Sequence, residues 1–140
     1  MTTSIARRVT LTAFAALATL AGSHAAAQAD PPKLAPAYEG SWDNLEAPAS
    51  GSLRITIDKV DADGTVTGTY TRDAAKVCAT KNLAFKGRLD GNALELVPDF
   101  GTDFRCKDTR WGLTLQADGT LAGTGQSYYS LKASLKPVAK

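Results

Sequence analysis

The sequence contains almost no histidine: there is one, His24, in 140 residues. It lies in an N-terminal segment that we expect to be removed, so the mature chain would contain none. A protein without histidine lacks the usual general base at neutral pH and the commonest zinc ligand. We therefore expect a non-enzymatic protein with no catalytic residues, no metal site and no cofactor.

The sequence also lacks an excess of charge of either sign. It has 16 Lys and Arg against 14 Asp and Glu. Two of the cations, Arg7 and Arg8, lie in the segment expected to be removed, which leaves 14 minus 14, a net charge of zero. An even balance gives no argument for binding to nucleic acid or acidic membranes, and we expect neither partner.

Residues 1–27 have the order of a secretory signal peptide. The basic pair Arg7-Arg8 is followed by an apolar run over residues 9–22 and then by small residues, with cleavage after Ala25 or Ala27. The run is shorter than the roughly 20 apolar residues that cross a bilayer, and no cysteine follows it for lipid attachment. We expect a periplasmic or secreted protein that does not insert into the membrane.

Cysteine is scarce as well, with only Cys78 and Cys106 in the chain. Export would place both in an oxidising compartment, where pairing is the default. Closing a loop of this size would stabilise the fold by roughly 3 to 4 kcal/mol. The spacing is far from that of a Cys-x-x-Cys redox motif, so we predict a structural disulfide.

No helical periodicity of useful length occurs after the signal peptide, and the pattern is that of strands and turns. Asp-Gly pairs at Asp63-Gly64, Asp90-Gly91 and Asp118-Gly119 are typical of tight hairpin turns, because glycine adopts positive φ freely. Between the turns, apolar residues alternate with polar ones, as in half-buried strands. The predicted strands span residues 38–44, 52–59, 65–72, 83–89, 93–97, 111–115, 120–126 and 129–136.

Eight short strands joined mainly by hairpins predict an all-β protein. An open sheet would leave two exposed edges, which closure removes, so we predict an eight-stranded antiparallel up-and-down β-barrel, with a β-sandwich as the alternative. Residues 28–37, with three prolines, would form a flexible leader, and residues 38–140 the single barrel domain. Glycines at 68, 87, 123 and 125 would face inward, fitting either tight curvature or room for one small ligand.

Two features of the sequence can be interpreted either as a binding site or as part of the fold. An EF-hand calcium loop through Asp63 and Gly64 would begin at Lys59 and end at Tyr70, neither of which is a suitable ligand, so the turn interpretation is favoured. The tryptophans could fill the core or line a ligand pocket. We expect Trp42 to belong to the core and leave both roles open for Trp111.

The stretch Gly40-Ser41-Trp42 resembles the calycin superfamily, whose barrels carry Gly-x-Trp on the first strand. Together with Asn44, the run Thr67-Gly68-Thr69-Tyr70 and Gly87-Arg88 before Asp90, it is similar to the avidin family. The resemblance implies a barrel in which Asn44 and Tyr70 hydrogen-bond the ureido oxygen of biotin. The chain departs from that pattern at residues 46–48 and at Arg72, where the family has serine or threonine.

Small exported protease inhibitors are a second calycin-like group that the chain resembles, through the barrel, the single disulfide and the early Gly-x-Trp. That resemblance implies that residues 30–37 would enter a protease cleft.

The functional expectation is an exported binding protein for a small apolar or amphipathic ligand or for a partner protein, acting as a monomer. Its candidate ligand-binding residues are Asn44, Tyr70, Trp111 and Tyr128, of which the last three would line the barrel opening. The alternatives are an inhibitor-like or envelope-interacting, antigenic protein that acts through its loops, and an avidin-like biotin binder.

Overall fold

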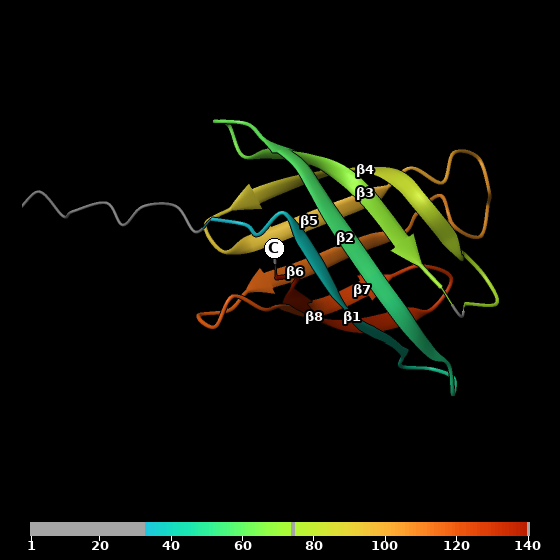
Figure 1. The fold of residues 1–140 in the computed structure, drawn as a ribbon. Helices are drawn as coiled ribbons and strands as arrows, with labels where there is room; N and C mark the ends of the chain where they lie inside the picture. The colour runs from blue at the N-terminus through green and yellow to red at the C-terminus, as the bar shows by residue number, and fades with distance from the viewer. Residues whose placement is uncertain (1–32, 74, 140) are drawn as a thin grey trace, which may run out of the picture.

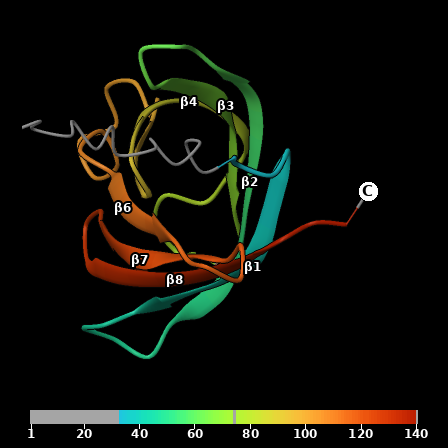
Figure 2. The ribbon, with the colours of Figure 1, turned by 90° about the vertical axis from the view of Figure 1, so that its left-hand side faces the viewer.

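The computed structural model describes residues 33–73 and 75–139; the segment expected to be a signal peptide lies outside them. The described chain forms a closed antiparallel barrel of eight strands, in which each strand pairs with its neighbours in sequence and the last pairs with the first (Figures 1 and 2). The predicted barrel is confirmed, and the sandwich is excluded. The strands are β1 (Ala37–Asn44), β2 (Ser50–Val60), β3 (Thr65–Arg72), β4 (Thr80–Asp90), β5 (Ala93–Pro98), β6 (Arg110–Leu115), β7 (Leu121–Gln126) and β8 (Ser130–Pro137).

One end of the barrel, which we call the hairpin end, is made of the three Asp-Gly turns and lies on the left in Figure 1. The glycines of these turns have φ of +89°, +58° and +85°, as the hairpin prediction requires. In the first turn the Asp63 carboxylate accepts the backbone N–H of Thr65 at 2.9 Å, and Asp118 accepts that of Thr120 at 3.0 Å. The repeated Asp-Gly-Thr sequence therefore builds the same turn twice.

The opposite end, the loop end, carries the longer connections and lies on the right in Figure 1. Its loops are residues 45–49, 73–79, 99–109 and 127–129. The predicted disulfide joins Cys78 in the second loop to Cys106 in the third, with 5.5 Å between the Cα atoms. Two of the four loops are therefore tied together covalently.

The alternating residues of each strand meet inside the barrel and form a continuous apolar core. Residue 34 adds to it, which corrects the expectation that the leader as a whole is flexible. Leu34 is only 9% exposed and packs against the core, and the carbonyl of Pro36 accepts the backbone N–H of Ile57 at 2.8 Å. Leu34 and the hydrogen bond of Pro36 thus hold residues 33–36 across the hairpin end, and β1 already begins at Ala37.

Two inward glycines make room for aromatic rings of neighbouring strands. A Cβ atom at Gly125 would lie 2.5 Å from the indole ring of Trp111, its partner across the β6–β7 pair. A Cβ at Gly68 would lie 2.9 Å from the Phe85 ring and closer still to the carbonyl oxygen of Thr56. At these two positions the space beside the glycine is filled by protein atoms, which argues against room for a ligand there.

Candidate functional site

Two of the expected site residues, Tyr70 and Trp111, meet inside the loop end of the barrel. They lie on inward-facing positions of β3 and β6, 41 residues apart in sequence, and are 0% and 1% exposed. The indole N–H of Trp111 donates a hydrogen bond of 3.1 Å to the Tyr70 hydroxyl. Burial raises the pKa of the Tyr70 phenol above its ordinary value of 10.0, and the positive charge of Arg72 partly opposes that rise. The hydroxyl is therefore neutral at physiological pH and keeps its own proton to donate.

Phe100, on the long loop between β5 and β6, lies against this pair. Its ring meets that of Tyr70 edge to face, with the centroids 6.3 Å apart and the planes at 82°. Edge-to-face pairs of this kind contribute about 0.5 to 1.5 kcal/mol beyond the area they bury. Phe100 is only partly buried, so it separates Tyr70 from solvent at the loop end.

Arg72 is the unexpected member of the site. It is the last residue of β3 and follows Val66, Gly68 and Tyr70 on the inward face, so the strand carries its side chain toward the core. The residue is 4% exposed, and its guanidinium carbon lies 4.3 Å from the centroid of the Trp42 ring. A cation over an indole face is stabilised by about 2 kcal/mol when it is desolvated.

Two of the three guanidinium nitrogens of Arg72 are buried without a hydrogen-bond acceptor in the described chain. Neither Nε nor Nη1 has a partner among residues 33–73 and 75–139, and Arg72 takes part in none of the ion pairs found there. The adjacent Asp73 carboxylate accepts the backbone N–H of Ser52 at 2.8 Å. A buried charge without an ion-pair partner costs on the order of several kcal/mol. The burial of Arg72 therefore lowers the free energy of unfolding.

Trp42 closes the site on the β1 side, in the core position expected for it. It is 1% exposed, and its indole N–H donates to the backbone carbonyl of Asp73 at 3.0 Å. The hydrogen bond joins β1 to the residue that follows Arg72 and fixes the ring on which the guanidinium rests. The site is thus a buried cluster of four side chains, Trp42, Tyr70, Arg72 and Trp111, which we call the loop-end cluster.

The other two expected site residues lie outside this cluster. The Asn44 side-chain oxygen accepts the backbone N–H groups of Glu46 and Ala47, at 2.8 and 3.1 Å, and so shapes its own loop. Tyr128 lies in the loop between β7 and β8, is 58% exposed and packs edge to face against Tyr129. The structure therefore does not bring Tyr128 to the opening beside Tyr70 and Trp111.

Hydrogen bonds around the disulfide connect three of the four loops. The Ser127 hydroxyl donates to the sulfur of Cys78 at 3.3 Å, and it lies 3.0 Å from the hydroxyl of Thr109. Thr109 is 1% exposed, and its backbone N–H donates to the carbonyl of Cys106. The disulfide and these hydrogen bonds therefore link three of the loops around the loop-end cluster.

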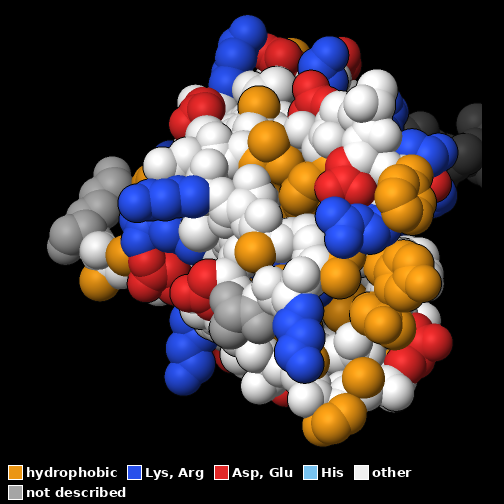
Figure 3. Space-filling model, turned by 90° about the vertical axis from the view of Figure 1, so that its right-hand side faces the viewer, with side chains coloured by type: hydrophobic (Ala, Val, Ile, Leu, Met, Phe, Trp, Pro, Cys, Tyr) orange, Lys and Arg blue, Asp and Glu red, His pale blue; other side chains and the backbone are white. Residues whose placement is uncertain are grey.

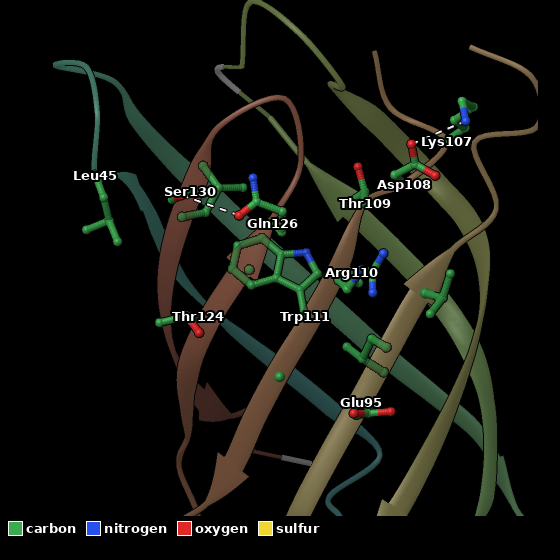
Figure 4. Close-up of a pocket in the computed structure, with 15 residues that line it drawn as sticks. Leu45, Glu95, Lys107, Asp108, Thr109, Arg110, Trp111, Thr124, Gln126 and Ser130 are labelled. Atoms are coloured by element: carbon green, nitrogen blue, oxygen red, sulfur yellow. Dashed lines mark hydrogen bonds and ion pairs between the residues drawn. The ribbon is translucent and has the colours of Figure 1, made fainter. Parts of the chain in front are cut away.

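A groove of about 640 Å³ lies on the barrel wall near the loop end, where β5 and β6 separate beyond the Leu96–Trp111 pair. Its lining includes three inward-facing residues, Leu96, Trp111 and Leu131, so it reaches the core from the outside. Figure 4 shows the Trp111 indole with Gln126 above it and Arg110 beside it. The groove thus approaches the loop-end cluster through Trp111.

Two further cavities, of about 740 and 660 Å³, lie at the hairpin end on either side of Leu34. Neither they nor the groove are lined by Tyr70, Arg72 or Trp42. Within the described residues, no group of three or more His, Cys, Asp or Glu could hold a metal ion. No helix of the described chain is long and apolar enough to cross a membrane.

The sequence contained a signal for one of the residues that its analysis missed. Arg72 continues an inward alternation, so a charged residue at that position breaks the pattern of the strand. Phe100 gave no such signal, because it lies in an irregular loop without periodicity.

Comparisons with known proteins found no relative of this chain: no family model, no curated protein and no solved structure matches it. The resemblance to calycins and avidins therefore rests on the short motifs alone.

Proposed function

We propose that this protein is a non-enzymatic, exported binding protein that holds a small amphipathic molecule at the loop end of its barrel. The observation that carries the proposal is the loop-end cluster, which buries a guanidinium, a phenol and two indoles at one end of an otherwise apolar core. Small-molecule sites combine apolar and aromatic walls with a few polar groups of this kind. Folding alone does not require such groups, because burying them is costly.

The interior side chains are closely packed, so the ligand would enter by displacing one. Phe100 is the natural candidate, because it is only partly buried, comes from a loop and lies against Tyr70. The groove that reaches Trp111 offers a second approach to the same cluster. The disulfide supports an oxidising location such as the periplasm or the medium. A closed barrel has no free strand edge, which supports a monomer.

Native mass spectrometry of the protein purified from its own exported fraction tests this proposal. We expect a bound small molecule that is lost on denaturation. The variant Tyr70→Phe removes the hydroxyl of the loop-end cluster and should reduce the bound fraction. Its matched control, Tyr38→Phe, removes a buried hydroxyl near the hairpin end, where it accepts the backbone N–H of Ala35, and should leave the fraction unchanged. A bare mass for the unmodified protein, with no binding in a ligand screen, would contradict the proposal.

The same experiment with added biotin tests the avidin-like alternative. That alternative implies that Asn44 and Tyr70 bind biotin together. Tyr70 belongs to the loop-end cluster, whereas the side-chain oxygen of Asn44 accepts two hydrogen bonds from its own loop. We therefore expect no tight biotin complex.

A partner protein is the second candidate, and it is favoured by apolar side chains exposed around the loop end. They include Leu45, Val97, Phe104, Tyr128 and Tyr129, of which Phe104 is 77% exposed. Figure 3 views this end and shows hydrophobic side chains gathered toward one side of it. Exposed patches of this kind mark interaction sites in soluble proteins. A bare native mass, together with co-purification of one protein that is lost in Phe104→Ser, would favour this function over the first.

A further inference from the structure

We propose that Arg72 binds the anionic head of the ligand, so that the small molecule held at the loop end is an amphipathic carboxylate. The inference rests on the proposed binding function and specifies its ligand class. It starts from a buried charge with unused donors: the residue is 96% buried, and its Nε and Nη1 have no acceptor within the described chain.

An arginine side chain carries donors only, and its charge persists at any physiological pH. The groups that satisfy it are therefore oxygens, and carboxylates match its planar fork well. No carboxylate of the described residues forms an ion pair with it, although five other pairs occur on the surface. The missing partner is a group that another molecule would supply.

The surroundings of Arg72 suit the rest of such a molecule. The Trp42 ring lies under the guanidinium, and Tyr70 and Trp111 are joined by their hydrogen bond nearby. Aromatic faces accept either an aliphatic chain or a flat ring, while the Tyr70 phenol remains protonated and can donate to an oxygen. Because Arg72 is the last residue of β3, its side chain lies directly beneath the loops rather than in the middle of the barrel.

A purely structural role would have a different signature. A guanidinium kept only for packing on Trp42 would gain nothing from a carboxylate, and an apolar side chain of similar length would replace it without changing ligand preference. The headgroup preference of the site therefore distinguishes the two roles.

The test compares two carboxylates with neutral counterparts: benzoate with benzamide, and dodecanoate with dodecanol. Affinities are measured by tryptophan fluorescence and calorimetry for the full mature protein and for three variants. Arg72→Met removes the charge, Arg72→Lys keeps it without the planar fork, and Arg54→Met removes an exposed arginine that pairs with Glu39 on the outer wall. Near-ultraviolet circular dichroism verifies the fold of each.

We expect the unmodified protein to bind at least one carboxylate tenfold or more tightly than its neutral counterpart. Arg72→Met should bring that ratio close to one, whereas Arg54→Met should leave it unchanged. If Arg72→Met does not fold, Arg72→Lys is used to test the inference. It should weaken binding of the carboxylate severalfold and leave binding of the neutral compound unchanged.

Three results would overturn the inference. If the unmodified protein binds charged and neutral compounds equally, it is a binding protein without an anion site, and only the inference is wrong. If Arg72→Met, or Arg72→Lys in its place, keeps the full preference, another group recognises the head. If no compound binds and the native mass is bare, the proposed function fails as well.

Discussion

Replacing Gly125 by alanine should destabilise the barrel through a single methyl group. The Cβ atom would lie 2.5, 2.6 and 2.8 Å from Cε3, Cδ2 and Cζ3 of the Trp111 indole. Ordinary carbon contacts begin at about 3.5 Å, so the ring must retreat by roughly 1 Å. It has little freedom to do so, because it is 1% exposed and its N–H is bonded to Tyr70.

The expected cost is the usual penalty for overpacking a core, about 1 to 3 kcal/mol. In urea this corresponds to a fall of roughly 1 M in the unfolding midpoint, given a slope of about 1 to 3 kcal/mol per M for a domain of this size. The fluorescence and near-ultraviolet dichroism of Trp111 should also change in the folded state, because the indole is displaced from its bond to the phenol.

Gly112 provides the matched control, since it follows Trp111 in β6 and no heavy atom lies within 4 Å of its added Cβ. Gly112→Ala should change the free energy of unfolding by no more than about 0.5 kcal/mol. If Gly125→Ala proves as stable as Gly112→Ala, the indole does not rest on Gly125 and the description of the loop-end cluster is wrong.

Three further predictions concern the disulfide, the turns and the N-terminal segment. Replacing Cys78 and Cys106 by alanine should cost about 3.6 kcal/mol, the entropy of a 28-residue closure, in chemical unfolding; a loss below 1 kcal/mol would contradict this. Hydrogen bonds from Thr65 and Thr120 hold the pKa values of Asp63 and Asp118 below the ordinary 3.8, so the folded state binds fewer protons there. The stability that these two carboxylates contribute should therefore be complete above about pH 4 and should be lost as the pH drops through their lowered pKa values. This acid sensitivity should be smaller in Asp118→Asn, and an unchanged pH profile would count against the turn geometry. Leu34→Ala should cost about 2 kcal/mol, at the lower end of the range for buried leucine, whereas substitution of exposed Lys33 should have no measurable effect.

The strands could be predicted closely because alternation and Asp-Gly turns are local signals. The predicted limits of β3, Thr65 and Arg72, are the observed ones, since the strand starts at a turn and alternates without interruption. The predicted start of β4, residue 83, lies three residues after the observed one, Thr80. Asn82 has φ of +51°, and the pairing with β3 shifts between Tyr70 and Arg72. An irregularity of this kind depends on the neighbouring strand, where the Thr71 hydroxyl accepts the N–H of Asn82.

The candidate site could be predicted only in part. Tyr70 and Trp111 lie on inward positions of regular strands, so their burial follows from alternation once the barrel is closed. Tyr128 lies in a loop, where no period decides its direction, and it faces outward. Leu34 was missed for a related reason: its burial depends on the open hairpin end of the finished barrel, which no local pattern describes.

The position of Arg72 connects fold and function more directly than any motif does. A sequence specifies its fold most securely when every inward position agrees with the core, and exceptions are expected where function requires them. The hairpin end has no such exception, because apolar Leu34 covers it and an aspartate carboxylate accepts a backbone N–H in two of its three turns. At the loop end, a charged residue occupies an inward position, three loops are fastened around it, and two of its nitrogens have no described acceptor. Stability alone would favour an apolar residue at position 72, and this is why we propose that the arginine is kept to bind an anionic ligand.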